Sequence, residues 1–589
     1  MIDNGGKILT NPKEVANCMN DYYIKIANEI GNDNNIPVIT DFPSTSEFVT
    51  ASKDYFASHP SITNIKNNCD TSNFTLKHID DDKTNKIIKS LNPKKATGTD
   101  TIPAKALIPA HDILAPVFAR LYNMCIDTAQ FPSCAKNAEV LPIYKKDDAL
   151  NKKNHRPVSI LTSSSKILEK ILDTELTNMW LNDIYNEHLS AFRRGYSCQH
   201  VLLSLTEKWH EAIEKKTTPG ILLVDLSKAF DCLSHSLTTA KLLAYGLDTN
   251  STTLISDYLS NRFQRVKING EFSSWERIPK GVPQGSIVGP TIFNIFINDI
   301  FQKFLKGSLL NYADDNTIFT ADKSIHKVKT NLQDASSTII NWCTDNQMEA
   351  NPAKFQTMIS GHNNINIEID ANTTILSEPH VKLLGVHIDS DLNFHFHVSN
   401  LIKKASRQLN CVKRIAYAFS VKIKLLLYKS FVLSNFNYCA VVWHHCVATN
   451  TKNLEKLQLR ALRFVFKDYT SSYDDLLQKA CLPTLELSRI RMIALEVFKI
   501  KNAMSPNYMN GADGMFKPPT NTYNLRSRNS ATIYHSSTTR HGLHSFRHYG
   551  ATIWNQLPGH LKTTTDYCTF KNFINTWDGP KCRCNSCRR

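Results

Sequence analysis

The spacing of hydrophobic residues predicts a chain in which strands and helices alternate. An apolar, β-rich run at 220–227 follows Pro219 and predicts a buried strand. Residues 308–321 predict a strand, a tight turn and a second strand. Shorter strands are predicted around a basic turn at 138–161, in a hairpin at 266–278, and at 354–360 and 381–388.

Helical spacing dominates elsewhere. Helices are predicted within 1–35, from Lys77 to a break at Asn92-Pro93, after Pro103, at 164–180, at 324–347, and through most of 390–504. Residues 36–74 are rich in Ser, Thr, Asn and Pro, which predicts a linker or an extended arm. Residues 505–540 have a loose linker composition, and short helices with a Cys-rich tail end the chain.

Composition narrows the class of protein. Hydrophobic residues make up 42% and charged residues 21% of the 589 residues, values typical of a globular protein. Lys and Arg outnumber Asp and Glu by 69 to 53, and this net charge of +16 indicates a polyanionic partner, nucleic acid before lipid. A basic surface without such a partner is the alternative. Fifteen scattered cysteines, no signal-peptide pattern and no apolar run of about 18 residues predict a soluble, intracellular protein.

Three carboxylates occupy the ends of predicted strands. Asp225 closes the strand at 220–227, and Asp314 and Asp315 lie together at the turn of the 308–321 hairpin. Two adjacent Asp side chains in an apolar hairpin are costly unless a cation neutralises them. Hard oxygen ligands suit Mg²⁺, and three carboxylates suffice for the two ions of phosphoryl transfer. An Asp-rich β-turn is the alternative.

Ordered motifs around these carboxylates carry a resemblance to a known family. VDLSKAFDCLSH (224–235), GVPQGSIVGPTIFNIFINDI (281–300) and NYADD (311–315) resemble motifs A, B and C of the reverse transcriptase palm. NPAKFQTMIS (351–360) resembles motif D, and VKLLGVHID (381–389) resembles the primer-grip hairpin. Upstream blocks at 91–107, 154–161, 166–172 and 191–197 agree. The chain is therefore similar to polymerases of non-LTR, LINE-type retrotransposons, jockey-like ones in particular, over 75–470 and more weakly over 541–575.

The resemblance implies a fold and a function. The fold is an α/β right hand with fingers, a palm built on an antiparallel sheet, a helical thumb and a basic C-terminal extension. Its parts are an N-terminal helix and linker at 1–74, fingers and palm at 75–390 with a core at about 125–390, a thumb at 391–504, and a linker with a Cys-containing tail at 505–589. The function is RNA-directed DNA synthesis: a DNA primer 3′-hydroxyl is extended on an RNA template with deoxynucleoside triphosphates and two Mg²⁺ ions, as part of retrotransposon mobilisation.

The same resemblance gives roles to individual residues. Asp225 and Asp314 would bridge both metals, with Asp315 as a secondary ligand. Phe230 would exclude a ribonucleotide 2′-hydroxyl, although an ordinary core Phe is the alternative. Gln284, followed by Gly285 in a bent loop, would touch the templating base and the incoming nucleotide, whereas a plain strand-to-helix turn is the alternative.

Basic residues complete the predicted site. In the resembling enzymes a Lys and an Arg of the finger hairpin clamp the triphosphate, and Lys146 and Arg156 fit best. Lys354 is a candidate general acid for the departing pyrophosphate. Five thumb residues would grip the template–primer duplex through its phosphates: Lys403, Lys404, Arg407, Lys413 and Arg414. A solvated surface is the alternative for each of these residues.

The C-terminal tail offers Cys582, Cys584 and Cys587, one thiolate short of a zinc site. His560 or Cys568 would have to complete it, and we do not expect zinc there. We expect His541, His544 and His548 to be stacking or surface residues rather than metal ligands.

Members of the resembling group carry an N-terminal endonuclease before the polymerase. We expect this chain to lack it, to lack a ribonuclease H domain, and to be a fragment of a longer element. Two alternatives stay open: a catalytically decayed copy that only binds RNA, and a polymerase of the group II intron maturase type. The nucleus and the cytoplasm are the expected locations.

Overall fold

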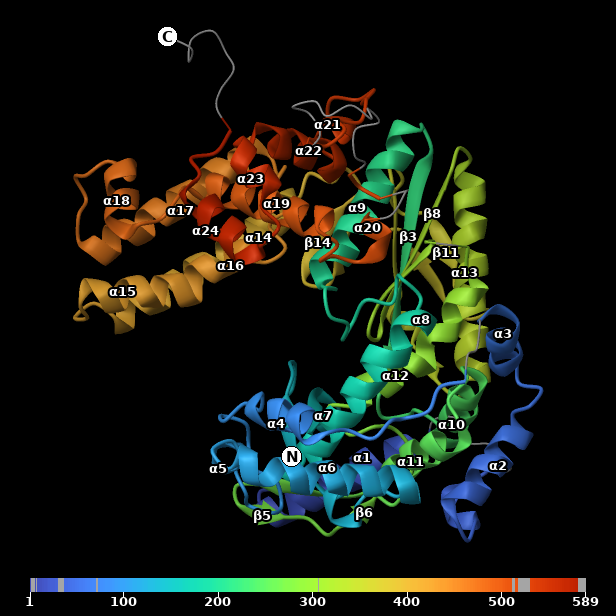
Figure 1. The fold of residues 1–589 in the computed structure, drawn as a ribbon. Coiled ribbons are helices and arrows are strands. Elements are labelled where there is room, and N and C mark those ends of the chain that lie inside the picture. Colours follow the sequence, from blue (N-terminus) through green and yellow to red (C-terminus); the bar gives the residue numbers. More distant parts are fainter. Residues whose placement is uncertain are drawn as a thin grey trace. The chain divides into compact units, whose positions relative to one another are not determined.

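The computed structural model describes residues 1, 6, 8–29, 36–69, 73–305, 307–510, 514–516 and 530–580 (Figure 1). They belong to two compact units. Unit 1 comprises Met1–Phe192, Asp225–Lys306 and Ser337–Asn351, and unit 2 comprises Arg193–Val224, Gly307–Ser336 and Pro352–Arg589. Each unit is described by itself below.

A small mixed sheet organises unit 1. Its strands run in the order β2-β1-β4-β5, with β6 also paired to β4. The bounds are β1 Ala138–Tyr144, β2 His155–Ile160, β4 Phe263–Ile268, β5 Glu271–Phe272 and β6 Glu276–Arg277. β1 pairs antiparallel with β2 and parallel with β4. The two strands predicted around a basic turn are therefore confirmed, and so is the hairpin after Val266.

Most other elements of unit 1 are helices. They include α1 (Pro12–Glu29), α4 (Asp81–Lys89), α5 (Ala104–Leu107), α6 (His111–Thr128), α7 (Ser163–Leu176), α10 (His235–Ala244), α11 (Thr249–Leu259) and α12 (Gly289–Ile297). α1 packs on the sheet through Ala16, Met19 and Tyr23, which form a small core with Val140 and Val266. The helices predicted after Lys77, after Pro103 and from about Ser164 are confirmed.

The prediction of a linker at 36–74 is wrong for two segments, which form α2 (Thr45–Tyr55) and α3 (Pro60–Asn68). Ser44 caps α2, and Pro60 occupies the first turn of α3, where its missing N–H costs nothing. Each helix buries a pair of apolar side chains: Phe48 and Val49 in α2, and Ile62 and Ile65 in α3. Burial of these pairs outweighs the polar composition that favoured a linker.

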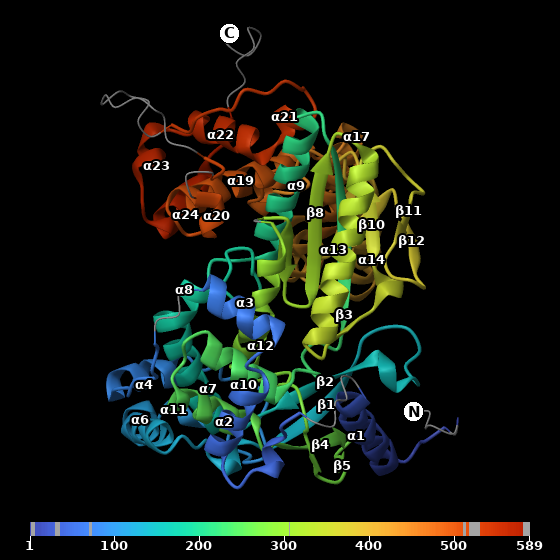
Figure 2. The ribbon, with the colours of Figure 1, turned by 90° about the vertical axis from the view of Figure 1, so that its right-hand side faces the viewer.

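A second sheet lies in unit 2, in the order β10-β3-β8-β7. The bounds are β3 Thr218–Ser227, β7 Leu309–Tyr312, β8 Asp315–Asp322 and β10 Gln356–Ile359. Figure 2 shows β3 and β8 beside α13 (Ile325–Asp345). A side chain at Gly220 would collide with Val328 and Leu332 of α13, so this glycine lets the helix approach the sheet. Two hairpins follow: β11 (Asn366–Glu368) with β12 (Thr374–Leu376), and β13 (His380–Leu383) with β14 (Val386–Asp389).

Beyond residue 390 unit 2 is helical, as predicted. Its helices are α14 (His395–Ile415), α15 (Val421–Leu427), α16 (Ser434–Asn437), α17 (Ala448–Phe466), α18 (Tyr473–Ala480), α19 (Leu485–Lys501), α20 (Asn507–Asn510), α21 (His541–His544), α22 (Phe546–Gln556), α23 (Gly559–Thr563) and α24 (Tyr567–Thr576). They share one hydrophobic core with α9 (Cys198–Glu214) and the sheet. None of the helices in the described ranges combines the length and hydrophobicity that crossing a bilayer requires.

Candidate active site

Asp225 lies near the end of β3, where the backbone is held on a second strand. The short strand β9 (Glu349–Ala350) pairs with Leu226 and Ser227, and the Asn351 N–H donates to the Asp225 carbonyl at 3.1 Å. The Asp225 side chain is half-buried. The predicted motif D segment therefore begins against the strand that carries Asp225.

The turn between β7 and β8 presents Asp314 and Asp315. Ala313 takes the left-handed conformation there, with φ of 57°. Two buried Asn side chains brace the turn: Asn311 Nδ2 donates to the Ala313 carbonyl at 2.7 Å and to Asn316 Oδ1 at 3.0 Å. Asp314 is half-buried and Asp315 is exposed. The sequence analysis missed both braces, although two Asn flanking a predicted hairpin turn were a signal.

The chemistry of these donors fits a divalent cation. Carboxylate oxygens at rigid strand ends are ligands that Mg²⁺ prefers. Within the ranges that the structure describes, however, no three His, Cys, Asp or Glu side chains are gathered as a metal centre. Cys582, Cys584 and Cys587 lie outside the described residues.

The loop from Gly281 to Gly289, which carries motif B, is held by backbone hydrogen bonds within unit 1. The Gly281 and Val282 N–H groups donate to the Leu233 and Phe230 carbonyls at 2.8 and 2.9 Å. On the other side, the Ser159 N–H donates to the Gln284 carbonyl at 2.8 Å. The loop is thus tied both to the segment after β3 and to β2.

Glycine is required at two positions of this loop. Gly281 has φ of 83°, and a Cβ there would lie 2.5 Å from the Asp231 carbonyl oxygen. Gly285 has φ of 133°, and a Cβ there would collide with the Ser159 carbonyl oxygen. An L-residue at either position would be strained in conformation and in contact. The bent loop predicted at Gln284 and Gly285 is confirmed.

A buried glutamate, Glu169, is hydrogen-bonded to the loop. Glu169 of α7 accepts hydrogen bonds from the Ile287 N–H at 2.6 Å and from Tyr258 Oη and Ser165 Oγ at 3.2 Å each. Burial raises the pKa of Glu169, and the nearby charge of Arg262 opposes that rise. The sequence analysis quoted this segment only as a family block and gave Glu169 no role.

Gln284 points its amide at a carboxylate. Gln284 Nε2 donates to Asp231 Oδ1 at 2.6 Å. Burial raises the pKa of Asp231, while this hydrogen bond and the charges of Lys228, Lys145 and Arg156 lower it. Asp231 was not among the predicted site residues, because an Asp after a strand is common and nothing in the spacing links it to Gln284.

Phe230 is half-buried and packs between two other aromatic rings. Its ring stacks on Phe293 of α12, with centroids 4.3 Å apart and planes inclined by 26°. The Phe192 ring meets it edge-on at 6.1 Å. One part of the Phe230 side chain therefore has a packing role while another part stays accessible.

The basic residues of the finger hairpin differ in surroundings. Lys146 is 82% exposed, and its Nζ lies 4.0 Å from Asp147. Arg156 is exposed on β2, with Ile143 as its cross-strand partner. The charges of Lys145 and Arg156 act on the carboxyl of Asp231. Lys354, in unit 2, is exposed at the end of the short 3₁₀ turn Pro352–Lys354.

Four of the five predicted thumb residues are exposed on α14: Lys403, Lys404, Arg407 and Arg414. Lys413 is half-buried instead, with its Nζ 5.8 Å from the centroid of the Phe464 ring. Burial, followed by the charge of Arg460, lowers the pKa of Lys413. This side chain therefore contributes to packing between α14 and α17.

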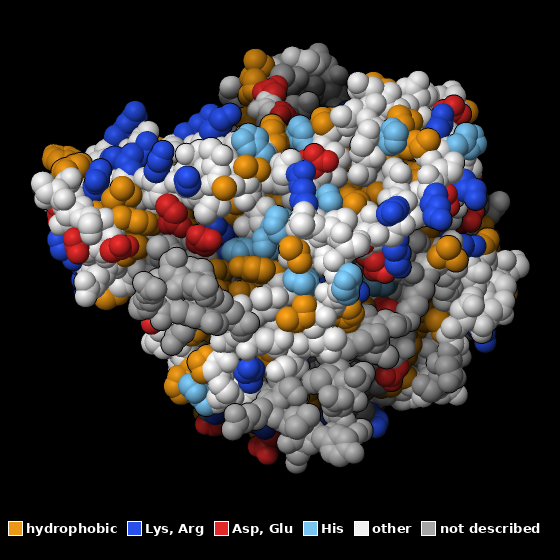
Figure 3. Space-filling view, turned by 90° about the horizontal axis from the view of Figure 1, so that it is seen from above, with side chains coloured by type: hydrophobic (Ala, Val, Ile, Leu, Met, Phe, Trp, Pro, Cys, Tyr) orange, Lys and Arg blue, Asp and Glu red, His pale blue; other side chains and the backbone are white. Residues whose placement is uncertain are grey.

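A second basic face went unnoticed in the sequence. Figure 3 shows Lys and Arg side chains gathered over the helices at its left. On α17 the exposed residues Lys452, Lys456 and Arg460 recur every four positions, and so share one face of the helix. The regular spacing was the available signal, although the predicted thumb contacts all lie on α14.

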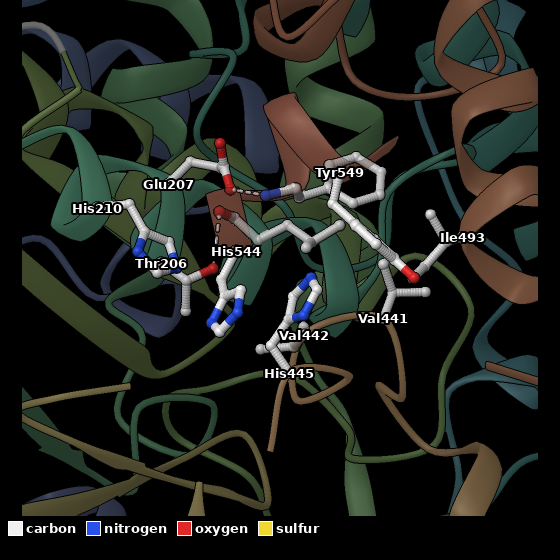
Figure 4. A pocket seen from close by; sticks show the side chains of 11 residues that line it. Thr206, Glu207, His210, Val441, Val442, His445, Ile493, His544 and Tyr549 are labelled. Carbon is white, nitrogen blue, oxygen red and sulfur yellow. Dashed lines mark hydrogen bonds between the residues drawn. The ribbon is translucent and has the colours of Figure 1, made fainter. Parts of the chain in front are cut away.

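A cluster of histidines lines a small cavity of about 20 Å³ within unit 2 (Figure 4). The rings of His445 and His544 stack with centroids 4.4 Å apart and planes parallel within 1°, so the predicted stacking role of His544 is confirmed. His210 Nδ1 and His445 Nε2 are buried and have no hydrogen-bond partner among the described residues. Glu207, beside them, accepts a hydrogen bond from the Phe546 N–H at 2.5 Å.

Burial controls protonation in this cavity. It lowers the pKa of His210 and of the neighbouring His444 to about 3 each, and the pKa of His445 to about 2. Burial raises the pKa of Glu207 to about 7. The imidazoles are therefore neutral at physiological pH.

The region that contains these motifs is similar to a known family. Residues 143–388 match the family model described as "Reverse transcriptase (RNA-dependent DNA polymerase)". Over this region, which is less than half of the chain, the protein is similar to reverse transcriptases. Asp225, Phe230, Gln284, Asp314 and Lys354 all fall inside the region, and the resemblance predicted from the motifs is confirmed.

Several relatives of this chain come from mobile elements. The chain is 25% identical over 401 residues to the "Probable RNA-directed DNA polymerase from transposon BS" of Drosophila melanogaster. It is 27% identical over 405 residues to the "RNA-directed DNA polymerase from mobile element jockey" of Drosophila funebris. Each alignment covers 64% of this chain but only 43% of the relative. The names agree with the predicted class, a polymerase of a non-LTR, jockey-like retrotransposon.

Proposed function

We propose that the protein is an RNA-directed DNA polymerase that extends a DNA primer on an RNA template during retrotransposon mobilisation. The observation that carries this proposal is the family match over 143–388, which contains the motifs in their expected order. The mixed α/β units fit a right-hand polymerase, with fingers and palm within 75–390 and a thumb at 391–504.

Two Mg²⁺ ions would be held by the carboxylates of Asp225, Asp314 and Asp315. The donor chemistry of three carboxylates at strand ends supports this assignment. When bound, the ions would lower the pKa of the primer 3′-hydroxyl and neutralise the triphosphate. The protein's own part is to hold the carboxylates on rigid strand ends, with the Asn311–Asn316 brace fixing the turn.

The nucleotide would be oriented by side chains of unit 1. Gln284 would contact the base pair being formed, and the glycine at position 285 would let the backbone approach it. The accessible part of the Phe230 ring would fill the space that a 2′-hydroxyl needs. Lys146 and Arg156 would bind the triphosphate, since a guanidinium matches phosphate oxygens in pairs. Lys354 would donate a proton to the departing pyrophosphate.

Template and primer would be gripped through their phosphates. The exposed face of α14, with Lys403, Lys404, Arg407 and Arg414, is the proposed contact, and the basic face of α17 has the same chemistry. Lys413 would support this face by packing on Phe464.

Primer extension on poly(rA) with an oligo(dT) primer tests the proposal. Asp314→Asn should reduce the rate on the order of a thousandfold, about 4 kcal/mol, because a shared metal ligand is lost. Asp322→Asn, at the far end of β8, is the matched control and should keep the wild-type rate. RNA binding should survive in both variants, because it depends on the basic faces.

Two results would contradict the proposal. Extension by Asp314→Asn at close to the wild-type rate would show that the metal assignment is wrong. A folded wild-type protein that binds RNA but extends no primer would instead support the alternative of a catalytically decayed copy.

A further inference from the structure

The hydrogen bond between Gln284 and Asp231 fixes the orientation of the Gln284 side-chain amide, with Nε2 towards Asp231. An ionised carboxylate only accepts hydrogen bonds. The amide atom 2.6 Å from Asp231 Oδ1 is Nε2, which donates to that oxygen. The second N–H and Oε1 of Gln284 are then directed away from Asp231.

This side-chain bond adds to a loop that the backbone already holds. The Val282 N–H donates to the Phe230 carbonyl, and the Ser159 N–H donates to the Gln284 carbonyl. Removing the Asp231 carboxylate leaves both of these bonds in place. What it removes is the preference for one of the two orientations that the Gln284 amide can adopt.

We propose that Asp231 is a positioning residue, which holds the side-chain amide of Gln284 in one orientation for the incoming nucleotide. The inference rests on the proposed function, in which Gln284 contacts the base pair being formed. A base pair presents donors and acceptors in fixed places, so an amide in the wrong orientation offers a donor where an acceptor is needed.

The charges around Asp231 suit this task. Lys228, Lys145 and Arg156 all act on its carboxyl, and the hydrogen bond from Gln284 also favours the ionised form. These cations oppose the effect of burial and help to keep Asp231 an acceptor. Asp231 acts on the nucleotide through Gln284, and it is therefore not a catalytic residue.

The test measures KM and kcat for dTTP on poly(rA)·oligo(dT). Asp231→Ala should raise KM about tenfold and change kcat by less than about twofold, the effect of losing one hydrogen bond to a charged group. Asp231→Asn should recover most of the wild-type KM, because Asn Oδ1 can accept the same bond. A residue with only a structural role would not separate KM from kcat in this way.

A double-mutant comparison isolates the path through Gln284. Asp231→Ala should raise KM by less than about twofold when Gln284→Ala is already present, because the amide to be positioned is gone. Asp112→Ala is the matched control: Asp112 accepts a hydrogen bond from Asn85 Nδ2, also at 2.6 Å, and its loss should leave KM unchanged.

Several outcomes would overturn the inference. Independent, multiplying effects of Asp231→Ala and Gln284→Ala would show that Asp231 acts by another route. A KM for Asp231→Asn as high as that of Asp231→Ala would show that charge alone matters. If Asp231→Ala does not fold, Asp231→Leu, which fills the space but cannot accept a hydrogen bond, replaces it in the same comparison with Gln284→Ala. Inactivity of the wild-type protein would instead count against the proposed function.

Discussion

The carboxylates around the loop at 281–289 in unit 1 and the histidines of the cavity in unit 2 differ in their hydrogen bonding. Around the loop, two carboxylates are hydrogen-bonded: Asp231 accepts from Gln284, and Glu169 accepts from Ile287. In the cavity, His210 and His445 each keep a buried ring nitrogen without a partner among the described residues. Pairing fixes side chains in one arrangement, whereas the unpaired imidazoles depend on staying neutral.

The same contrast appears in the pKa values. Burial raises the pKa of Glu169 and Asp231 near the loop, and lowers the pKa of three histidines near the cavity. A buried acid binds its proton more readily in the folded state, and a buried histidine binds it less readily. His235, whose Nε2 contacts the Gly281 carbonyl and whose pKa burial lowers to about 4, opposes the two acids near the loop, so acid should destabilise the cavity more than the loop.

The largest expected effect is a loss of stability around the cavity between pH 7 and pH 5. His210, His444 and His445 have folded pKa values of about 3, 3 and 2, below the unfolded value of about 6.5. The unfolded state then binds more protons as the pH falls below 6.5. By pH 5, each histidine lowers the free energy of unfolding by about 2 kcal/mol. Glu207, with a pKa of about 7, returns about 2 kcal/mol, so the net loss is about 4 kcal/mol.

Hydrogen exchange, corrected for the intrinsic rate, measures this loss locally. Protection of α9 should fall between pH 7 and pH 5, whereas protection of α7, which carries Glu169, should hold or increase. Equal losses in α7 and α9 would remove the contrast between the two regions.

Gly285→Ala should break the loop itself. The φ of 133° is costly for alanine, and the new Cβ meets the Ser159 carbonyl. We expect a cost of about 2 to 3 kcal/mol, expressed as a displaced loop and weaker nucleotide binding. A lower melting temperature together with a raised KM for dTTP would confirm it. Gly270→Ala, at a hairpin position with φ of 91° and nothing within 4 Å, separates conformational strain from the collision.

Phe230→Val tests whether loop packing and nucleotide selection share one ring. The variant should keep much of its activity with deoxynucleotides and gain ribonucleotide incorporation at least tenfold, about 1.4 kcal/mol. Single-turnover extension with dTTP and UTP measures both. A parallel fall with the two nucleotides would leave Phe230 as a packing partner of Phe293 and nothing more.

The smallest expected effect distinguishes the roles of the neighbouring residues Lys145 and Lys146. Lys146→Ala should raise the KM for dTTP about fivefold, about 1 kcal/mol, because an exposed ammonium is lost from the triphosphate. Lys145→Ala should change it less than about twofold, since the Lys145 charge acts on Asp231. The opposite order would move the triphosphate contact to Lys145.

Features encoded by local sequence motifs were predictable, whereas contacts between distant segments of the chain were not. The strand that carries Asp225, the hairpin turn that presents Asp314 and the bend at Gly285 were predictable, because each follows from local spacing. The Gln284–Asp231 bond joins residues 53 positions apart, and the His445–His544 stack joins unrelated segments, so local spacing could not indicate either. At α2, composition concealed the burial of Phe48 and Val49.

The Asn311–Asn316 brace has a consequence for how such a gene decays. The turn that bears Asp314 and Asp315 is held by the neutral amides of Asn311 and Asn316, which bond to each other and to the backbone carbonyls of Ala313 and Asp314. Because these bonds do not depend on charge, we expect a variant with one carboxylate replaced by its amide to keep them and to fold. Under the proposed function, a copy that has lost a catalytic carboxylate would then still make a folded protein with basic faces, and that protein would compete with active copies for the same RNA.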